Sequence, residues 1–192
     1  MFSAGWGFFL TPDASSLGDW KGRIAIDNGA WSSYQNDEEW SPRRFVPLVE
    51  RHGHASDFVV SPDIVAGGSD SLSRSLEWLP RLLGMCKRVL IPVQDGMVPE
   101  DVEEYLSERV GVFVGGSTDW KLGAMRAFCD AATRRGAWSH IGRVNSVRRI
   151  NLCLSCRATS FDGTSVSRYA KTLPRLDAAR RQSTLFERFD NV

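Results

Sequence analysis

The chain has 192 residues, of which 42% are apolar, and this is enough for one sizeable hydrophobic core. Its formal net charge of +1 at pH 7 does not by itself indicate a polyanionic partner. No stretch approaches the roughly 20 consecutive apolar residues of a membrane-spanning helix, so we expect no membrane partner.

Short runs rich in Ile, Val and Phe alternate with helix-like segments along the chain. We predict strands at about residues 5–10, 23–27, 57–61, 88–93, 111–115, 138–142 and 157–161. A helix is predicted from Ser41-Pro42, with Ser as N-cap and Pro at the first helical position, to about Gly53. Further helices are predicted over 69–86, from Pro99 through Leu106, over 119–135, over 146–154, and from 165 onward with a break near Pro174.

The repeated strand–helix order predicts an α/β fold with a parallel sheet. Two architectures fit this order, a closed barrel and an open doubly wound sheet. An ordinary TIM barrel takes about 250 residues, so a barrel of this length is minimal or incomplete. The chain contains no linker, repeat or low-complexity segment, and we expect one domain over residues 1–192.

Several predicted strands end in a carboxylate, an amide or a glycine pair. In barrels and doubly wound sheets the carboxyl ends of the strands meet at the edge where ligands bind. A carboxylate accepts hydrogen bonds from the N1–H and exocyclic amine of a guanine-like base, and a glutamine both donates and accepts. The residues at these strand ends are Asp27, Asp63, Gln94, Gly115, Gly116 and Asp162.

Each of these residues also has a purely structural explanation. Asp27 before Asn-Gly suits a turn, Asp63 and Asp162 suit helix caps, and Gly115-Gly116 suits a tight turn. The joint pattern favours function, because all of them fall at the same end of successive strands. Trp31, Tyr34 and Trp120 are candidate stacking faces for a base.

Charge is distributed unevenly along the chain. Residues 1–120 carry 10 Lys or Arg against 18 Asp or Glu, whereas residues 121–192 carry 14 against 5. The basic C-terminal third indicates a nucleic-acid face, and the alternative is a solvated helix surface. The candidates for phosphate contacts are Arg143, Arg148, Arg149, Arg157, Arg168 and Lys171.

The four cysteines are scattered at positions 86, 129, 153 and 156. Cys153-x-x-Cys156 resembles half of a zinc site, but the chain has no second pair of this kind and its three histidines are dispersed. We therefore expect no metal and interpret the cysteines as small buried apolar residues. The N-terminus lacks the features of a signal peptide, so we expect a cytoplasmic protein with free thiols.

The ordered motifs resemble the tRNA-guanine transglycosylases, and most closely their phage relatives, the DNA-guanine transglycosylases. Asp27-Asn28-Gly29-Ala30-Trp31 resembles that family's Asp-Ser-Gly-Gly-aromatic segment, and Val93-Gln94-Asp95-Gly96 resembles its Val-Gln-Gly-Gly. Val114-Gly115-Gly116 resembles its glycine loop, and Phe161-Asp162 resembles the Phe-Asp that supplies its nucleophile. Asp63 stands where the family has its base-reading aspartate, and the segment 140–146 fits the same register. The resemblance covers roughly residues 23–170 in the family's order.

The resemblance implies a compact, minimal or incomplete TIM-like β/α barrel without the family's zinc subdomain, whose Cys/His cluster is absent here. It implies that guanine in DNA is exchanged for a 7-deazaguanine base, preQ0 or a derivative, with no cofactor. Asp162 would attack C1′ and Asp27 would transfer the proton, while Asp63, Gln94, Gly115 and Gly116 would bind the base.

Several alternatives stay open at this point. The substrate is DNA or tRNA, and a nucleoside deoxyribosyltransferase and a non-catalytic nucleic-acid-binding barrel also fit the pattern. Self-association into a homo-oligomer stays open too. A phage-encoded protein would act in the host cytoplasm.

Overall fold

The structure is a computed structural model in which residues 6–14, 16–165 and 170–181 are described. Seven parallel strands form one sheet, and each strand pairs with its neighbours in the order of the chain. The strands are β1 (Phe8–Leu10), β2 (Ile24–Ile26), β3 (Val59–Val60), β4 (Val89–Val93), β5 (Val110–Val114), β6 (Ser139–Ile141) and β7 (Ser160–Phe161).

Helices connect most of these strands. The α-helices are α1 (Ala30–Gln35), α2 (Pro42–His52), α3 (Gly68–Leu83), α4 (Thr118–Arg134), α5 (Val147–Ser155) and α7 (Leu173–Arg180). Short 3₁₀ turns are η2 (Gly53–Ala55), η3 (Pro99–Asp101), η4 (Glu103–Tyr105) and η5 (Ala170–Thr172). No helix in the described ranges is long and apolar enough to cross a membrane.

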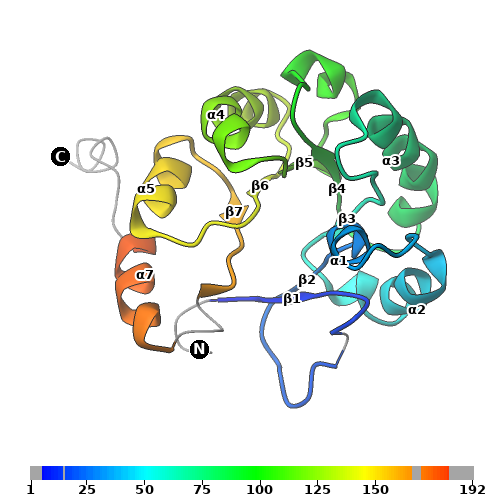
Figure 1. Cartoon of the computed structure of the whole chain (residues 1–192), viewed down its shortest axis with the longest axis horizontal. Coiled ribbons are helices and arrows are strands. Elements are labelled where there is room, and N and C mark those ends of the chain that lie inside the picture. The colour runs from blue at the N-terminus through cyan, green and yellow to red at the C-terminus, as the bar shows by residue number, and fades with distance from the viewer. Residues whose placement is uncertain (1–5, 15, 166–169, 182–192) are drawn as a thin grey trace.

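The sequential strand order disagrees with a doubly wound sheet, one of the two architectures that the sequence left open. A doubly wound sheet reverses its strand order at a switch point, whereas the order here follows the chain from β1 to β7. Parallel crossovers are right-handed, so a sequential order places the helices on one face of the sheet. Figure 1 shows the helices outside a sheet that curls toward its other face, as in half of a barrel.

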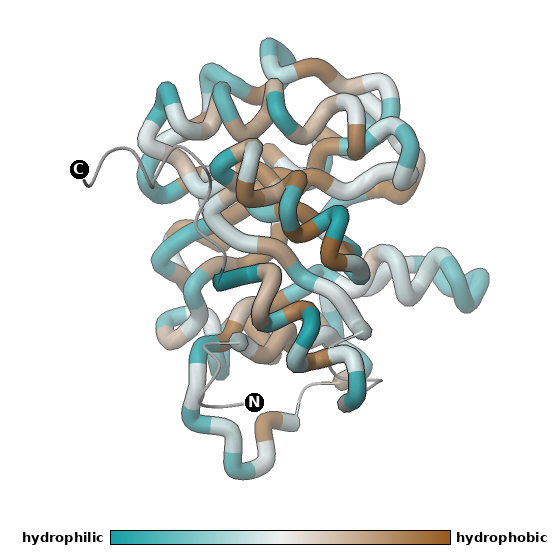
Figure 2. Tube along the Cα trace, turned by 90° about the vertical axis from the view of Figure 1, so that its left-hand side faces the viewer, coloured by the Kyte–Doolittle hydropathy of each residue, from teal (hydrophilic) through white to brown (hydrophobic). Residues whose placement is uncertain are grey.

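Side chains alternate between the helix-facing side and the inner side of the curled sheet. The helix-facing residues form two large clusters with the helices, one around β4–β6 and one around β1–β3. In Figure 2 the helices alternate brown and teal along the trace, as amphipathic helices packed on a sheet should. The inner side carries a third cluster, made of Phe9, Ala25, Phe58, Val60, Leu90, Phe113 and Trp138.

Aromatic rings bring the two halves of the sheet together on this inner side. Phe9 of β1 lies 6.3 Å from Phe113 of β5 and 5.7 Å from His140 of β6, measured between ring centroids. Phe58 lies 5.0 Å from the His140 ring, and Phe113 stacks on it at 5.1 Å and 16°. The inner space is therefore filled by aromatic side chains at the level of His140.

Trp6 occupies the seam between the first and last strands, which are the two edges of the sheet order. Its ring meets Phe161 of β7 edge-on at 6.0 Å, and its indole N–H donates to Asp177 of α7 at 3.2 Å. The Arg180 guanidinium lies over the same ring at 5.5 Å. Side chains therefore join β1, β7 and α7 where the described residues show no strand pairing.

All seven predicted strands are present at the predicted places. The helix predicted from Pro99 is replaced by the two 3₁₀ turns η3 and η4, and the short helix α1 was not predicted. The break predicted near Pro174 coincides with the boundary between η5 and α7, and Pro174 stands in the first turn of α7, where its missing N–H leaves no bond unmade.

Candidate functional site

The polar residues predicted at the strand ends follow the carboxyl ends of their strands at one edge of the sheet. Asp27 follows β2, Asp63 follows β3 and Asp162 follows β7. Gln94 and the Gly115-Gly116 pair follow β4 and β5. Since all strands are parallel, these groups meet at the same edge, and the electrostatic influence of Asp162 and Asp63 on Asp27 shows that the three carboxyls gather there.

Two side-chain amides hold the Asp63 carboxylate from neighbouring strand ends. Asn28 Nδ2 donates to Asp63 Oδ1 at 2.8 Å, and Gln94 Nε2 donates to Asp63 Oδ2 at 3.1 Å. Asn28 is itself fixed, because its Nδ2 also donates to Ser61 O and its Oδ1 accepts from Ala30 N. The orientation of Asp63 is thus set by groups on both sides of β3.

The Gln94 amide is engaged at both of its ends. Its Oε1 accepts from Ala66 N at 2.7 Å, while its Nε2 donates to Ile64 O at 2.8 Å and Ser71 Oγ at 2.6 Å, besides Asp63. Gln94 therefore fastens the loop between β3 and α3. Direct reading of a base by Gln94 stays a prediction, and it would require one of these bonds to be given up.

Asp27 lies in the most acidic surroundings of the site. Burial raises its pKa to about 7, and the charges of Asp162 and Asp63 act in the same direction. The backbone N–H groups of Gly29 and Asn28 oppose the rise. A carboxyl with a pKa near 7 can both give and take a proton at neutral pH.

Burial also raises the pKa of Asp63, to about 6, against the hydrogen bond from Asn28 and the charge of Arg74. Above pH 6 this carboxyl is therefore ionised and accepts hydrogen bonds at both oxygens. Asp27 and Asp63 are half-buried, and the pKa values of both carboxyls are raised toward the neutral range, as is common for groups that transfer protons or bind polar ligands.

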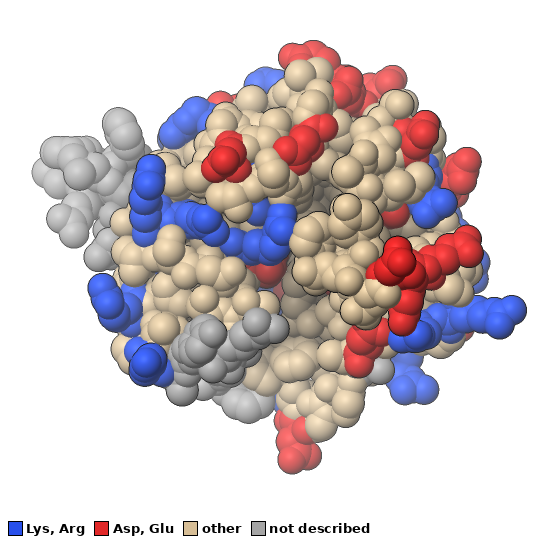
Figure 3. Space-filling view, in the orientation of Figure 1, with Lys and Arg blue, Asp and Glu red and all other residues tan. Residues whose placement is uncertain are grey.

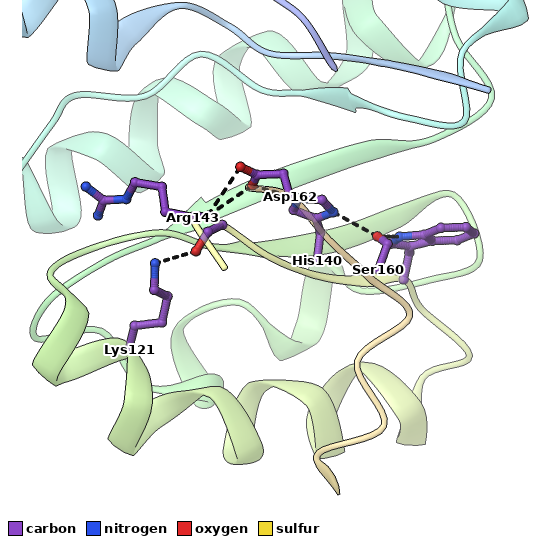
Figure 4. A network of polar contacts seen from close by, with 7 residues as sticks. Lys121, His140, Arg143, Ser160 and Asp162 are labelled. Atoms are coloured by element: carbon purple, nitrogen blue, oxygen red, sulfur yellow. Dashed lines mark hydrogen bonds and ion pairs between the residues drawn. The ribbon is translucent and has the colours of Figure 1, made fainter. Parts of the chain in front are cut away.

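The Asp162 carboxylate is held by hydrogen bonds from a side chain and from the backbone of the loop after β6 (Figure 4). Its Oδ1 accepts from His140 Nε2 at 3.1 Å and from Arg143 N at 3.2 Å, and its Oδ2 accepts from Arg143 N at 3.3 Å. The Asp162 side chain keeps 22% of its surface exposed, so solvent and ligands reach it.

His140 belongs to a chain of hydrogen bonds that runs from Asp162 into the inner side of the sheet. Its Nδ1 lies 2.8 Å from Ser160 Oγ, and Ser160 Oγ accepts from Trp138 Nε1 at 2.6 Å. The sequence analysis counted His140 among the dispersed histidines and placed it in the segment 140–146, which fits the family's register, but gave it no role of its own. The useful signal was strand register, because His140 on β6 lies opposite Ser160 on β7.

The same three residue types form the catalytic triad of serine hydrolases, but here Ser160 and Asp162 are both half-buried and the serine oxygen is already engaged. In a triad the serine faces the substrate and the aspartate is buried. Here Asp162 faces the opening, whereas Ser160 lies on the inner side and already accepts a hydrogen bond from Trp138. This arrangement favours Asp162, not Ser160, as the group that meets a ligand.

Lys121 is a second group that sequence reasoning missed. It is only 2% exposed, and its Nζ donates to Gly142 O in the loop after β6. Burial lowers its pKa to about 8, together with the charge of Arg143, while Asp162 acts in the opposite direction. The available signal was its position on the apolar face of α4, in line with Met125 and Phe128 at helical spacing.

The two glycines after β5 have different roles. Gly115 N donates to Val93 O at 2.9 Å as part of the sheet. Gly116 has a φ of +65°, and a Cβ there would lie 2.5 Å from Asp95 Oδ2 and 2.7 Å from the Trp120 ring. Only Gly116 is therefore required by its backbone conformation and by close packing.

Arg143 crosses the rim of the site from the loop after β6. Its guanidinium donates to Gly116 O and lies 4.8 Å from the Trp31 ring centroid on α1. Trp31 is 42% exposed and stacks on Tyr34 at 5.8 Å. The rim thus offers a cation and an exposed aromatic side chain, which are the kinds of group that bind phosphates and bases.

The other predicted basic residues are placed unequally. Arg149 of α5 donates to Arg143 O at 3.5 Å, and Arg148 is exposed next to it on the same helix. Arg157 stands in the loop that enters β7, at the opposite edge of the sheet, so it is not brought to the carboxylates. Lys171 is exposed in η5, and Arg168 lies outside the described residues.

Figure 3 shows the surface around this edge. Basic side chains run from the side of α5 and α4 toward the centre of the view, and an acidic side chain is visible in the hollow beside them. The charge pattern suits a polyanion that lies across the basic side and reaches into an acidic centre.

All four cysteines are buried and unpaired. Within the described ranges, no group of three or more His, Cys, Asp or Glu side chains is arranged to hold a metal ion. Cys153 and Cys156 face the core between α5 and the sheet, where they pack as apolar residues.

In comparisons with known proteins, the chain matches no protein-family model and no curated protein.

Proposed function

We propose that this protein is a guanine transglycosylase that exchanges guanine in DNA for a 7-deazaguanine base through a covalent aspartyl-glycosyl intermediate. The proposal takes the sheet as a minimal or incomplete TIM-like barrel without the zinc subdomain. The observation that carries it is the pairing of two different carboxyls at one strand-end edge. Asp162 is partly exposed and held by hydrogen bonds, and Asp27 near it has a pKa of about 7.

In the first half of the proposed reaction, an Asp162 oxygen attacks C1′ of a target guanosine. The C1′–N9 bond breaks, the C1′–O bond forms, and Asp27 gives its proton to the leaving guanine. In the second half, N9 of the entering base attacks C1′, the C1′–O bond breaks, and Asp27 takes the proton of the entering base. One glycosidic bond replaces another, so no external energy source is needed.

Asp63 is the proposed reader of the base edge. An ionised carboxylate accepts from the N1–H and the exocyclic amine that guanine and 7-deazaguanines share. Its pKa of about 6 keeps it ionised at neutral pH, and Asn28 and Gln94 hold its orientation. The exposed Trp31 ring and the cationic side chains of Arg143 and Arg149 would receive the flipped nucleotide and its phosphates.

The test incubates DNA, labelled guanine or preQ0, and the protein, and measures label in DNA together with a denaturation-resistant protein–DNA adduct. Wild type should incorporate label and form the adduct. Asp162→Ala should lose both, with a rate lower by at least about a thousandfold, because the nucleophile is gone. Asp130→Asn is the matched control, because Asp130 is an exposed acid on the surface of α4.

Unchanged exchange in Asp162→Ala would contradict the proposal. Label entering tRNA but not DNA would assign the tRNA branch, and turnover of mononucleosides would assign a nucleoside deoxyribosyltransferase.

The basic rim beside the site favours one alternative of a different class, a non-catalytic nucleic-acid-binding barrel. DNA binding that weakens steeply with salt, without exchange and without affinity for guanine, would select that alternative.

A further inference from the structure

In the proposed reaction, Asp162 must act as a nucleophile in the first half and as a leaving group in the second half. These demands oppose each other, because the charge on the carboxylate disappears when the glycosyl ester forms and returns when the ester breaks. Groups that donate hydrogen bonds to Asp162 stabilise the charged state, so they act in opposite directions in the two halves.

The hydrogen-bond chain behind Asp162 determines which nitrogen of His140 carries a proton. The Trp138 indole N–H can only donate, so Ser160 Oγ accepts from it at 2.6 Å. Asp162 Oδ1 as a carboxylate oxygen can only accept, so His140 Nε2 carries a proton, and the Ser160 hydroxyl, 2.8 Å from Nδ1, can donate to that other nitrogen in the neutral ring. The Nε2–H group points at Asp162 Oδ1 at 3.1 Å.

The His140 ring is fixed by packing as well as by these bonds. His140 is 3% exposed, and its ring is stacked on Phe113 and flanked by Phe9 and Phe58. It therefore presents its N–H to Asp162 without having to reorganise during the reaction. The backbone N–H of Arg143 supplies a second donor from a φ of +58°, a conformation that few residues other than glycine adopt.

Oδ1 accepts from His140 Nε2, and the single Arg143 N–H is shared between Oδ1 and Oδ2. The less occupied Oδ2 is therefore the oxygen that attacks C1′, and Oδ1 becomes the ester carbonyl oxygen that keeps its donors. When the entering base displaces Asp162, the electron pair of the C1′–Oδ2 bond returns to the carboxylate, and its charge spreads onto Oδ1.

We propose that His140, oriented by Ser160 and Trp138, is a positioning residue that promotes the departure of Asp162 from the glycosyl-enzyme and so prevents the protein from remaining trapped on DNA. This inference rests on the proposed transglycosylation. It gives a role to the histidine–serine–tryptophan chain, which takes no direct part in the two bond-exchange steps.

The test separates the two half-reactions in the full-length protein. Adduct formation is followed with DNA alone, and adduct decay is followed after addition of guanine or preQ0, both on denaturing gels. His140→Phe keeps an aromatic ring against Phe113 and removes the donor. We expect adduct decay to slow roughly tenfold and the adduct fraction at steady state to rise, because a hydrogen bond to a charged group contributes about this factor.

Two further variants guard against loss of structure. His140→Gln keeps a side-chain donor and should restore much of the decay rate. Ser160→Ala removes the group that orients His140 and should slow decay in the same direction by a smaller factor. Thermal unfolding of all variants shows which of them are folded.

The outcomes distinguish this inference from the proposed function. If wild type forms an adduct but folded His140→Phe and Ser160→Ala release it as fast as wild type, the inference fails and the function stands. If formation and decay fall by the same factor, His140 is merely structural and the inference again fails. Absence of both adduct and exchange in wild type overturns the proposed function, and the inference with it.

Discussion

Asp27 combines burial with two neighbouring carboxylates, and this combination makes its protonation sensitive to pH in the neutral range. Its pKa of about 7 lies far above the value of 3.8 that it has in an unperturbed chain. In the proposed reaction, protonated Asp27 donates a proton to the leaving guanine, and ionised Asp27 accepts a proton from the entering base. The two half-reactions should therefore respond to pH with opposite slopes.

We expect the single-turnover rate of adduct formation to fall about tenfold per pH unit above pH 7, because only protonated Asp27 can give its proton. Adduct decay with preQ0 should instead rise toward a plateau above pH 7. Rapid-quench measurements between pH 5.5 and pH 9 on wild type and Asp27→Asn would check this. A formation rate in Asp27→Asn that keeps the wild-type slope would show that another group titrates.

Lys121 illustrates the cost of a buried cation. Folding lowers its pKa from 10.5 to about 8, so between these two values the unfolded chain holds a proton that the folded protein has released. The unfolded state then binds more protons, and stability rises with pH in this window and is flat below it.

The variant Lys121→Met lacks this titration. Its free energy of unfolding relative to wild type should therefore decrease as pH rises from 8 to 10, by up to about 1.4 kcal/mol per pH unit. Urea unfolding of both proteins at pH 7 and pH 9.5 measures the difference, in which titrations common to the two proteins cancel. A difference independent of pH would show that the Lys121 pKa is not lowered by folding.

At the scale of the elements, the loops after the strands are tied to each other by side chains. Asp95 after β4 accepts from Ser117 N and Ser117 Oγ at the N-cap of α4, which holds its pKa below the usual range. Gly116 lies against the same carboxylate and against Trp120. The loop after β5 is therefore closely packed on its α4 side.

Gly116→Ala should lower the free energy of unfolding by about 1–3 kcal/mol, because it adds a Cβ at positive φ and in contact with Asp95 and Trp120. The neighbouring Gly115→Ala is the matched control, since its Cβ would meet Val93 O at 3.5 Å, an ordinary contact. Denaturant unfolding of the two variants compares them directly. Equal losses at both positions would contradict the account of this turn.

The strands were predictable because each is a short run of Ile, Val or Phe, and buried parallel strands need little else. The strand-end carboxylates were predictable because parallel strands bring their carboxyl ends to one edge. The roles of Asn28, His140 and Lys121 were not, because their partners lie on other strands and helices. Those contacts depend on register and curl, which local patterns do not encode.

The helix expected after Pro99 shows a different limit. Val98 begins this segment with its N–H bound to Asp101, and the chain then makes two separate 3₁₀ turns. The apolar spacing of Val102 and Leu106 is the same in an α-helix and in this arrangement, where both side chains reach the core. Periodicity alone could not separate the two.

At the scale of the whole molecule, the two ends of the sheet order meet at a seam where, among the described residues, the contacts come from side chains. Trp6 touches Phe161, hydrogen bonds to Asp177 and carries Arg180 on its ring. Phe161 immediately precedes Asp162, so the seam also supports the strand that presents the proposed nucleophile.

Trp6→Ala should lower the free energy of unfolding by about 2–4 kcal/mol and reduce exchange, because it opens the seam beside β7. Trp31→Ala removes an exposed ring and should cost less than about 1 kcal/mol, while weakening DNA binding. Thermal or urea unfolding together with the exchange assay distinguishes the two variants. A Trp6 variant as stable as wild type would mean that the seam does not hold the sheet.

The aromatic layer beneath His140 has a consequence for the order of events in the proposed reaction. Phe9, Phe58 and Phe113 fill the inner side of the sheet at that level, so a base beside Asp162 has the rim as its way out. In the proposed reaction, guanine then leaves by the same route at the rim by which the new base enters, so guanine must leave before the new base can bind. Between the departure of guanine and the arrival of the new base, the covalent bond from Asp162 to C1′ holds the sugar that has lost its base.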